Sequence, residues 1–140
     1  DRSARAEMAF ASLSGGLALA NAGLGAVHGL AAPLGGMFPA PHGAVCAALL
    51  PQVFAANAKH TPDRFAEVTK MLGAGNTAES GANWLRILAN DLNIPGLATY
   101  GIAENDFPEL IAKARKASSM KTNPADLSDG ELAGILRAAL

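Results

Sequence analysis

Apolar and small residues run almost unbroken through the first part of the chain, and charged residues gather in the second. No Asp, Glu, Lys or Arg occurs between Met8 and Ala58. The opening stretch, from Arg2 to about Ala22, is apolar nearly all round, which is typical of a helix buried on every side. The pattern therefore predicts a central buried helix at the start of the chain.

Prolines and glycines divide the sequence that follows. A second helix is expected from about Leu24 to Gly36, and Pro33 should kink or end it, because proline lacks an N–H and clashes with the preceding turn. A third helix is expected from His42 to about Lys59. Pro51 should kink this helix, unless a separate segment begins there.

Helix-start signals mark the charged half of the chain. Thr61 is an expected N-cap before Pro62, Asn76 with Glu79 fits an N-cap and its N3 partner, and Ser128–Glu131 reads as a capping box. Helices are expected over about 61–72, 76–92, 106–118 and 131–140. No run alternates as a strand would. The predicted fold class is all-α, a bundle of six to eight helices in one domain, residues 1–140.

Composition excludes some partners. The chain has 140 residues, half of them apolar, which is enough for one domain with a core. Its net charge of −1 lacks the basic footprint of a nucleic-acid binder. The Met8–Val27 run has the length of a membrane span, but it is rich in Ala, Gly and Ser, contains Asn21, and precedes several prolines. We therefore expect neither a membrane span nor a nucleic-acid partner.

Cysteine usage points to a cellular compartment. The single Cys46 excludes an intrachain disulfide and favours reducing surroundings. The residues after Asp1–Arg5 lack the cleavage context of a signal peptide. A cytoplasmic location is expected.

Two histidines, His28 and His42, lie inside the uncharged stretch. Burying a titratable ring without a partner costs about 1–3 kcal/mol, so each ring needs a reason to be there. Ligation of a metal ion or of a substrate oxygen is one reason, and a structural histidine in the core is the other. The rings are fourteen residues apart with prolines between them. Only a fold that brings the two segments together makes a site, and metal sites need three or four ligands.

Other residues leave similar choices open. Cys46 lies one helical turn after His42, so it is either a further metal donor or an ordinary buried thiol. Gly23-Leu24-Gly25 resembles the opening of a dinucleotide loop, but the third glycine is His28 and no strand precedes it. These glycines more simply permit close helix contact or irregular backbone.

Features nearer the C-terminus have plain interpretations. His60 is expected at a solvated helix end. Lys113, Arg115 and Lys116 should form a small solvated basic face. Residues 121–124 are expected to form a turn.

The chain closely resembles the iron-dependent (group III) alcohol dehydrogenases. The resemblance lies in Gly23–Gly36 with its His28, in Pro41-His42-Gly43, and in Leu49-Leu50-Pro51. The later Ser118-Ser119-Met120-Lys121, with Asn123-Pro124 and Leu127, is similar to the same family's C-terminal stretch. The resemblance covers essentially the whole chain.

This resemblance implies a two-domain enzyme. Such enzymes have an N-terminal Rossmann-like domain that binds NAD or NADP, and a helical, dehydroquinate synthase-like C-terminal domain that holds a divalent metal, Fe²⁺ or Zn²⁺. An Asp and three His hold the metal, and two of these His match His28 and His42. The other two ligands lie upstream of Asp1 in the family. The chain is thus expected to be the C-terminal part of a larger dehydrogenase, inactive alone.

The resemblance also implies an activity. The complete protein is expected to oxidise a small alcohol to an aldehyde or ketone, or the reverse, by metal-assisted hydride transfer, and to form a homo-oligomer. In two places the chain departs from the family: Ala32 stands where many members have His, and Cys46 where Asn is usual. A maleylacetate reductase-like enzyme of the same superfamily and a non-catalytic helical interaction module with structural histidines are the alternatives.

Overall fold

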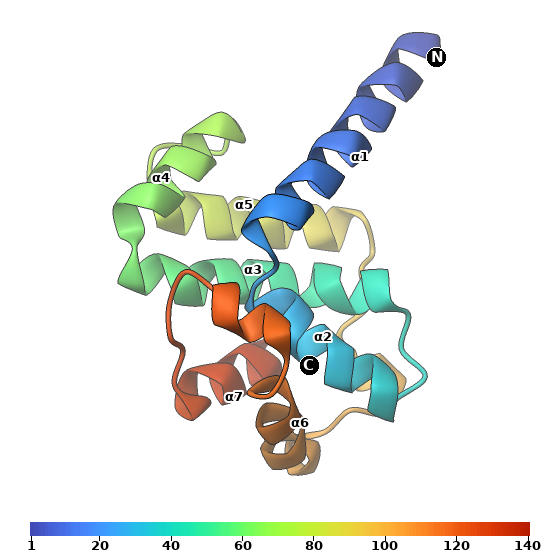
Figure 1. Cartoon of the computed structure of the whole chain (residues 1–140), viewed down its shortest axis with the longest axis vertical. Helices are drawn as coiled ribbons and strands as arrows, with labels where there is room; N and C mark the ends of the chain where they lie inside the picture. The colour runs from blue at the N-terminus through green and yellow to red at the C-terminus, as the bar shows by residue number, and fades with distance from the viewer.

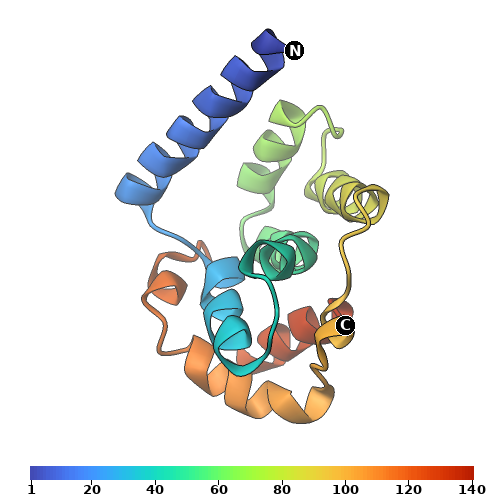
Figure 2. The same ribbon diagram turned by 90° about the vertical axis from the view of Figure 1, so that its right-hand side faces the viewer.

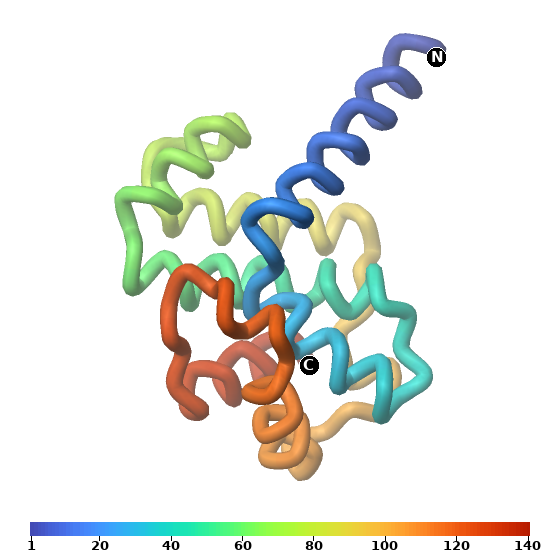
Figure 3. The backbone as a smooth tube through the Cα atoms, viewed as in Figure 1, coloured from blue at the N-terminus to red at the C-terminus, as the bar shows by residue number.

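The computed structural model describes residues 1–140 and is all-α, as predicted (Figures 1 and 3). It contains no strand. The α-helices are α1 (Arg2–Ala22), α2 (Ala26–Met37), α3 (His42–His60), α4 (Pro62–Met71), α5 (Ala78–Asp91), α6 (Phe107–Ala114) and α7 (Asp129–Ala138). Three short 3₁₀ helices join them, η1 (Leu97–Tyr100), η2 (Glu104–Asp106) and η3 (Ser118–Thr122).

The central helix of the fold is α2. Its residues Ala26, Leu30, Ala31 and Leu34 are completely buried, and their spacing places them along one side of the helix. α3, α6 and η3 pack around it, and Figure 2 shows α2 enclosed by these elements. The main core therefore joins α2, α3, α6 and α7 in one apolar cluster.

The prediction that the first helix is buried is wrong for this chain. No residue of α1 is buried, and Met8 and Phe10 are 70% and 71% exposed. In both ribbon views α1 extends away from the body (Figures 1 and 2). The apolar pattern correctly predicted a helix, but no other helix among residues 1–140 packs along it.

No single helix combines the length and hydropathy that a membrane crossing needs. The pair α1 and α2 passes the test of length and composition when taken together, but the two helices meet at an angle of 97°.

Neither α2 nor α3 ends at its proline, so the predicted alternatives of an end near Pro33 and of a separate segment from Pro51 are not observed. α2 continues through Pro33 to Met37, and α3 continues through Pro51 to His60. Each proline removes one backbone hydrogen bond, and packing of the surrounding turns offsets that loss. Pro51 is itself buried, and Leu34 beside Pro33 is completely buried. Tertiary contacts therefore override the local signal.

The predicted helix starts are only partly correct. The Ser128–Glu131 capping box is present, although α7 already begins at Asp129. The capping box of α5 is formed by Thr77 and Ser80, so the prediction for Asn76 is one residue off. The Thr61 hydroxyl does not cap α4, because it donates to the carbonyl of Asn57.

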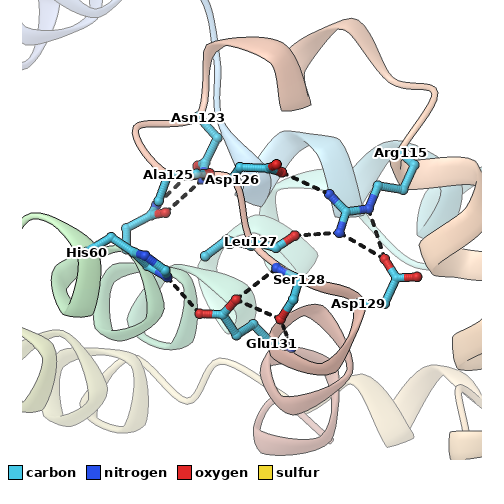
Figure 4. A network of polar contacts seen from close by, with 10 residues as sticks. His60, Arg115, Asn123, Ala125, Asp126, Leu127, Ser128, Asp129 and Glu131 are labelled. Carbon is cyan, nitrogen blue, oxygen red and sulfur yellow. Dashed lines mark hydrogen bonds and ion pairs between the residues drawn. The ribbon is translucent and has the colours of Figure 1, made fainter.

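Arg115 holds the segment that leads from η3 to α7. Its guanidinium donates to Asp126, Asp129 and the carbonyl of Leu127 (Figure 4). The prediction that Arg115 belongs to a merely solvated basic face is therefore wrong. The side chain fixes the loop between η3 and α7.

His60 is exposed at the end of α3, as predicted, and it also has a specific partner. Its Nε2 lies 2.7 Å from Oε1 of Glu131, whose other oxygen accepts from the backbone N–H and hydroxyl of Ser128 (Figure 4). The hydrogen bond from His60, followed by those from Ser128, lowers the pKa of Glu131 to about 2. The end of α3 is thereby tied to the start of α7.

Candidate metal centre

The fold brings the two histidines of the uncharged stretch together. His28 lies in the first turn of α2, and His42 is the first residue of α3. The loop 38–41 reverses the chain, so the ring centroids are only 5.4 Å apart, with the ring planes at 50°. The spacing in sequence left this juxtaposition open, and the packing of α2 on α3 creates it.

Cys46 adds a third donor to the pair. It lies one turn after His42 on α3, and its Sγ is 3.5 Å from Nε2 of His42. One donor atom from each of His28, His42 and Cys46 lies within 4.8 Å of the others. His28 and Cys46 are half-buried and His42 is exposed, so the cluster is open to solvent on one side.

Burial shifts the pKa values of His28 and Cys46 in opposite directions. Burial first, and the neighbouring His42 second, lower the pKa of His28. The neutral imidazole is the form with a free lone pair for a metal ion. Burial raises the pKa of the Cys46 thiol, so without a bound cation this side chain carries its proton.

The donor types and separations of the cluster suit a divalent transition-metal ion. Neighbouring donors in a tetrahedral site of nitrogen and sulfur ligands are separated by about 3.3–3.6 Å, given metal–ligand distances of about 2.0–2.3 Å. The three donor atoms lie within 4.8 Å of one another, and the Sγ of Cys46 and Nε2 of His42 are 3.5 Å apart, which falls in this range. No carboxylate belongs to the cluster. One or more positions around the ion would therefore be left to other ligands.

A pair of amide side chains holds the start of α2 in place. Asn123 Oδ1 accepts from the backbone N–H of Ala26 at 3.0 Å and from Nδ2 of Asn57 at 3.1 Å. Its own Nδ2 donates to Oδ1 of Asn57 and to the carbonyl of Ala125, both at 2.7 Å. The first turn of α2, which carries His28, is thus anchored to α3 and to the η3 segment.

Sequence analysis missed this pair. The only signal was Asn57 among alanines near the end of a predicted helix, and the expected turn at 121–124 gave no hint of its partner. The interpretation of the glycines is confirmed, because a side chain at Gly25 would meet Asn123 Oδ1 at 2.9 Å. Gly23 has a φ of 74°, which favours glycine.

An apolar groove of about 560 Å³ adjoins the donor cluster. His28 and Cys46 form part of its wall, and Leu50, Val53 and Phe54 of α3 supply apolar surface. The groove therefore places carbon-rich walls beside two of the three candidate donor side chains.

The chain is an all-α domain with a candidate metal-donor cluster where the two central helices α2 and α3 begin. The sequence profile of the Fe-containing alcohol dehydrogenase family, C-terminal, matches residues 1–140. The chain belongs to this family.

Individual relatives agree with this assignment. The chain is 38% identical to 1,3-propanediol dehydrogenase of Klebsiella pneumoniae, over 97% of the chain and 37% of that protein. It is 31% identical to lactaldehyde reductase of Escherichia coli strain K12, over 99% of the chain and 38% of that protein. The chain thus spans well under half the length of these relatives.

Solved structures show the same fold. A crystal structure of 1,3-propanediol oxidoreductase superimposes with a TM-score of 0.89 at 37% identity, over 95% of this chain and 37% of that one. The iron-containing alcohol dehydrogenase of Thermococcus thioreducens gives a TM-score of 0.85 at 27% identity, over 99% of this chain and 38% of that one.

Proposed function

We propose that the complete protein is a divalent-metal- and NAD(P)-dependent alcohol dehydrogenase that interconverts a small alcohol with an aldehyde or ketone. This chain contributes its helical metal-binding domain. The observation that carries the proposal is the adjacency of the His28 and His42 rings at the start of α2 and α3. Family membership and relatives named for propanediol and lactaldehyde support it.

His28 and His42 are the proposed metal ligands on this chain, for Fe²⁺ or Zn²⁺. A divalent cation held there supplies Lewis-acid polarisation of an alcohol or carbonyl oxygen. Burial keeps His28 neutral and therefore ready to bind, and the Asn123 contact with Ala26 fixes the turn that carries it. The remaining ligands are proposed to come from the part of the protein that precedes this chain.

The carbon skeleton of the alcohol is proposed to occupy the groove beside His28. An alcohol bound there would displace water from the apolar walls beside the donor cluster, and electrostatic stabilisation is stronger where water is displaced. The nicotinamide cofactor is proposed to bind mainly to a separate Rossmann-like domain. The chain itself lacks a glycine-rich phosphate loop, since His28 takes the place of the third glycine.

Such a domain partner accounts for the exposed apolar surface of α1. Leu13 and Leu17 are 61% and 58% exposed, on a helix without a single buried residue. Ala22 at the end of α1 lines the groove, so α1 leads directly to it. We further propose a cytoplasmic, homo-oligomeric enzyme.

The test is the metal content of the complete gene product, purified without oxygen, beside its His28→Ala variant. Stoichiometric iron or zinc, lost in the variant together with NAD(P)-linked alcohol oxidation, is the expected result. His60→Ala is the matched control, because His60 lies at the far end of α3 and contacts Glu131. Absence of metal from the unmodified protein, or full activity in His28→Ala, would overturn the proposal.

A further inference from the structure

We propose that Cys46 is a metal donor in this protein, and that its thiolate shifts the preference of the site toward thiophilic ions such as Zn²⁺. The inference rests on the proposed metal site at His28 and His42. It goes beyond the family resemblance, which implies an Asn at this position and ligands of Asp and His only.

Geometry is the first argument. Cys46 and His42 are four residues apart on α3, so their side chains lie on the same face of the helix. Their Sγ and Nε2 atoms are 3.5 Å apart. An ion with a sulfur ligand at about 2.3 Å and a nitrogen ligand at about 2.05 Å in adjacent positions separates the two donors by about 3.1–3.6 Å, whether it has four ligands or more. The separation of Sγ and Nε2 therefore already suits a shared ion.

Position is the second argument. Cys46 lies on the wall of the groove together with His28, so the thiol faces the same space as the proposed ligand of the other helix. The donor atoms of His28, His42 and Cys46 all lie within 4.8 Å of one another. A thiol packed only as an apolar side chain would not need to lie within 4.8 Å of nitrogen atoms from two imidazoles.

Metal binding by Cys46 requires only the loss of the thiol proton. When the cation binds, the Cys46 thiol releases its proton to solvent and a metal–sulfur bond forms, without any change of oxidation state. The 3.5 Å contact with His42 is also compatible with a thiol–imidazole hydrogen bond in the absence of metal. The two states are distinguished by whether sulfur bonds to the ion.

Ligand softness gives the expected consequence. Thiolate and imidazole favour Zn²⁺, whereas carboxylate and amide oxygens suit harder ions such as Mn²⁺. An Asn at position 46 would offer only an amide. This chain should therefore discriminate between Zn²⁺ and Mn²⁺ more strongly than its Cys46→Asn variant.

The experiment loads the complete gene product with Co²⁺ and records its absorption spectrum. A thiolate-to-cobalt charge-transfer band in the near ultraviolet is expected for the unmodified protein and for Ala47→Ser, the control one residue further along α3. Cys46→Ser and Cys46→Asn should both retain cobalt and lose this band. Competition between Zn²⁺ and Mn²⁺ should show that the ratio of the two affinities is about 10-fold lower in each variant than in the unmodified protein. Substitutions around metal ligands reduce metal affinity by at least about this factor.

The outcomes separate this inference from the proposed function. Cobalt bound without a charge-transfer band, or an unchanged band in both Cys46 variants, overturns the role of Cys46. Loss of metal in His28→Ala would in that case still support the dehydrogenase. Failure of the unmodified protein to bind Co²⁺, Zn²⁺ or Fe²⁺ overturns both. Circular dichroism of the two Cys46 variants verifies that they fold.

Discussion

The side-chain amides of Asn57 and Asn123 bond to each other in both directions, at 3.1 and 2.7 Å, although 66 residues separate them in sequence. Asn57 is only 4% exposed, so its polar atoms depend on this partner. Asn123 also accepts from the first N–H of α2. The pair therefore links α3, the η3 segment and the helix that carries His28.

Replacing Asn123 should destabilise the protein and loosen the metal site. Asn123→Ala leaves the amide of Asn57 and the N–H of Ala26 without partners, at a cost of about 1–3 kcal/mol in the free energy of unfolding. Urea unfolding of the complete gene product measures this cost, and metal dissociation should become faster as well. Asn105→Ala, at an exposed position, should change neither quantity. Equal behaviour of the two variants would contradict the role of the pair.

Two glycines of α2 should respond oppositely to the same substitution. A methyl group at Gly29 would overlap the side chain of Met120 in η3, so Gly29→Ala should lower the stability by about 1–3 kcal/mol. Gly35 has no atom within 4 Å of the added carbon, so Gly35→Ala should raise the stability by about 0.5–1 kcal/mol. Thermal unfolding of both variants, compared with the unmodified protein, measures these two changes in stability. A stabilised Gly29→Ala protein would mean that Met120 moves aside without cost.

Local sequence signals predicted most helices of this fold. The capping box at Ser128–Glu131 lies where predicted, and the helix predicted to end at 92 ends at Asp91, because both features depend on neighbours in the chain. Pro33 does not end α2, because its local cost is offset by packing around Leu34. The prediction that α1 is buried failed as well. Its apolar pattern indicates burial, but does not say whether the covering surface lies among these residues.

The site could be predicted only in part. His28 and His42 stood out because polar rings in an uncharged stretch need partners, but their distance depends on how α2 packs on α3. The family resemblance, rather than spacing, favoured metal ligation. Asn57 and Asn123 gave no usable signal, because a reciprocal amide pair between distant segments leaves no local pattern.

The exposed surface of α1 should make residues 1–140 associate when they are produced alone. Phe10 and Leu17 are 71% and 58% exposed, and their spacing of seven residues places them on one face. The double variant Phe10→Lys, Leu17→Lys should reduce dye binding and self-association, measured by sedimentation. Leu92→Lys, at a position 62% exposed but outside α1, is the control. A monomer that binds no hydrophobic dye would contradict the prediction.

In the complete gene product the double variant Phe10→Lys, Leu17→Lys should destabilise the protein. If a further domain covers Phe10 and Leu17, each lysine costs about 1.5–3 kcal/mol of lost apolar burial. The Tm should then fall well below that of the Leu92→Lys control. An unchanged Tm would show that α1 is exposed in the complete protein as well.

Acid should remove the stabilisation that Glu131 provides. The hydrogen bond from His60, followed by those from Ser128, lowers the pKa of Glu131 from its ordinary value of 4.5 to about 2. Because the folded-state pKa lies below the unfolded one, the contribution is complete above about pH 5 and is lost as the pH falls toward about 2. Calorimetry should therefore show that the Tm difference between the unmodified protein and Glu131→Gln shrinks over this range. Glu109→Gln, which removes an exposed carboxylate paired with Lys113, controls for the change in net charge. A Tm difference that stays constant from neutral to strongly acidic pH would show that the contacts of Glu131 do not favour its charged form.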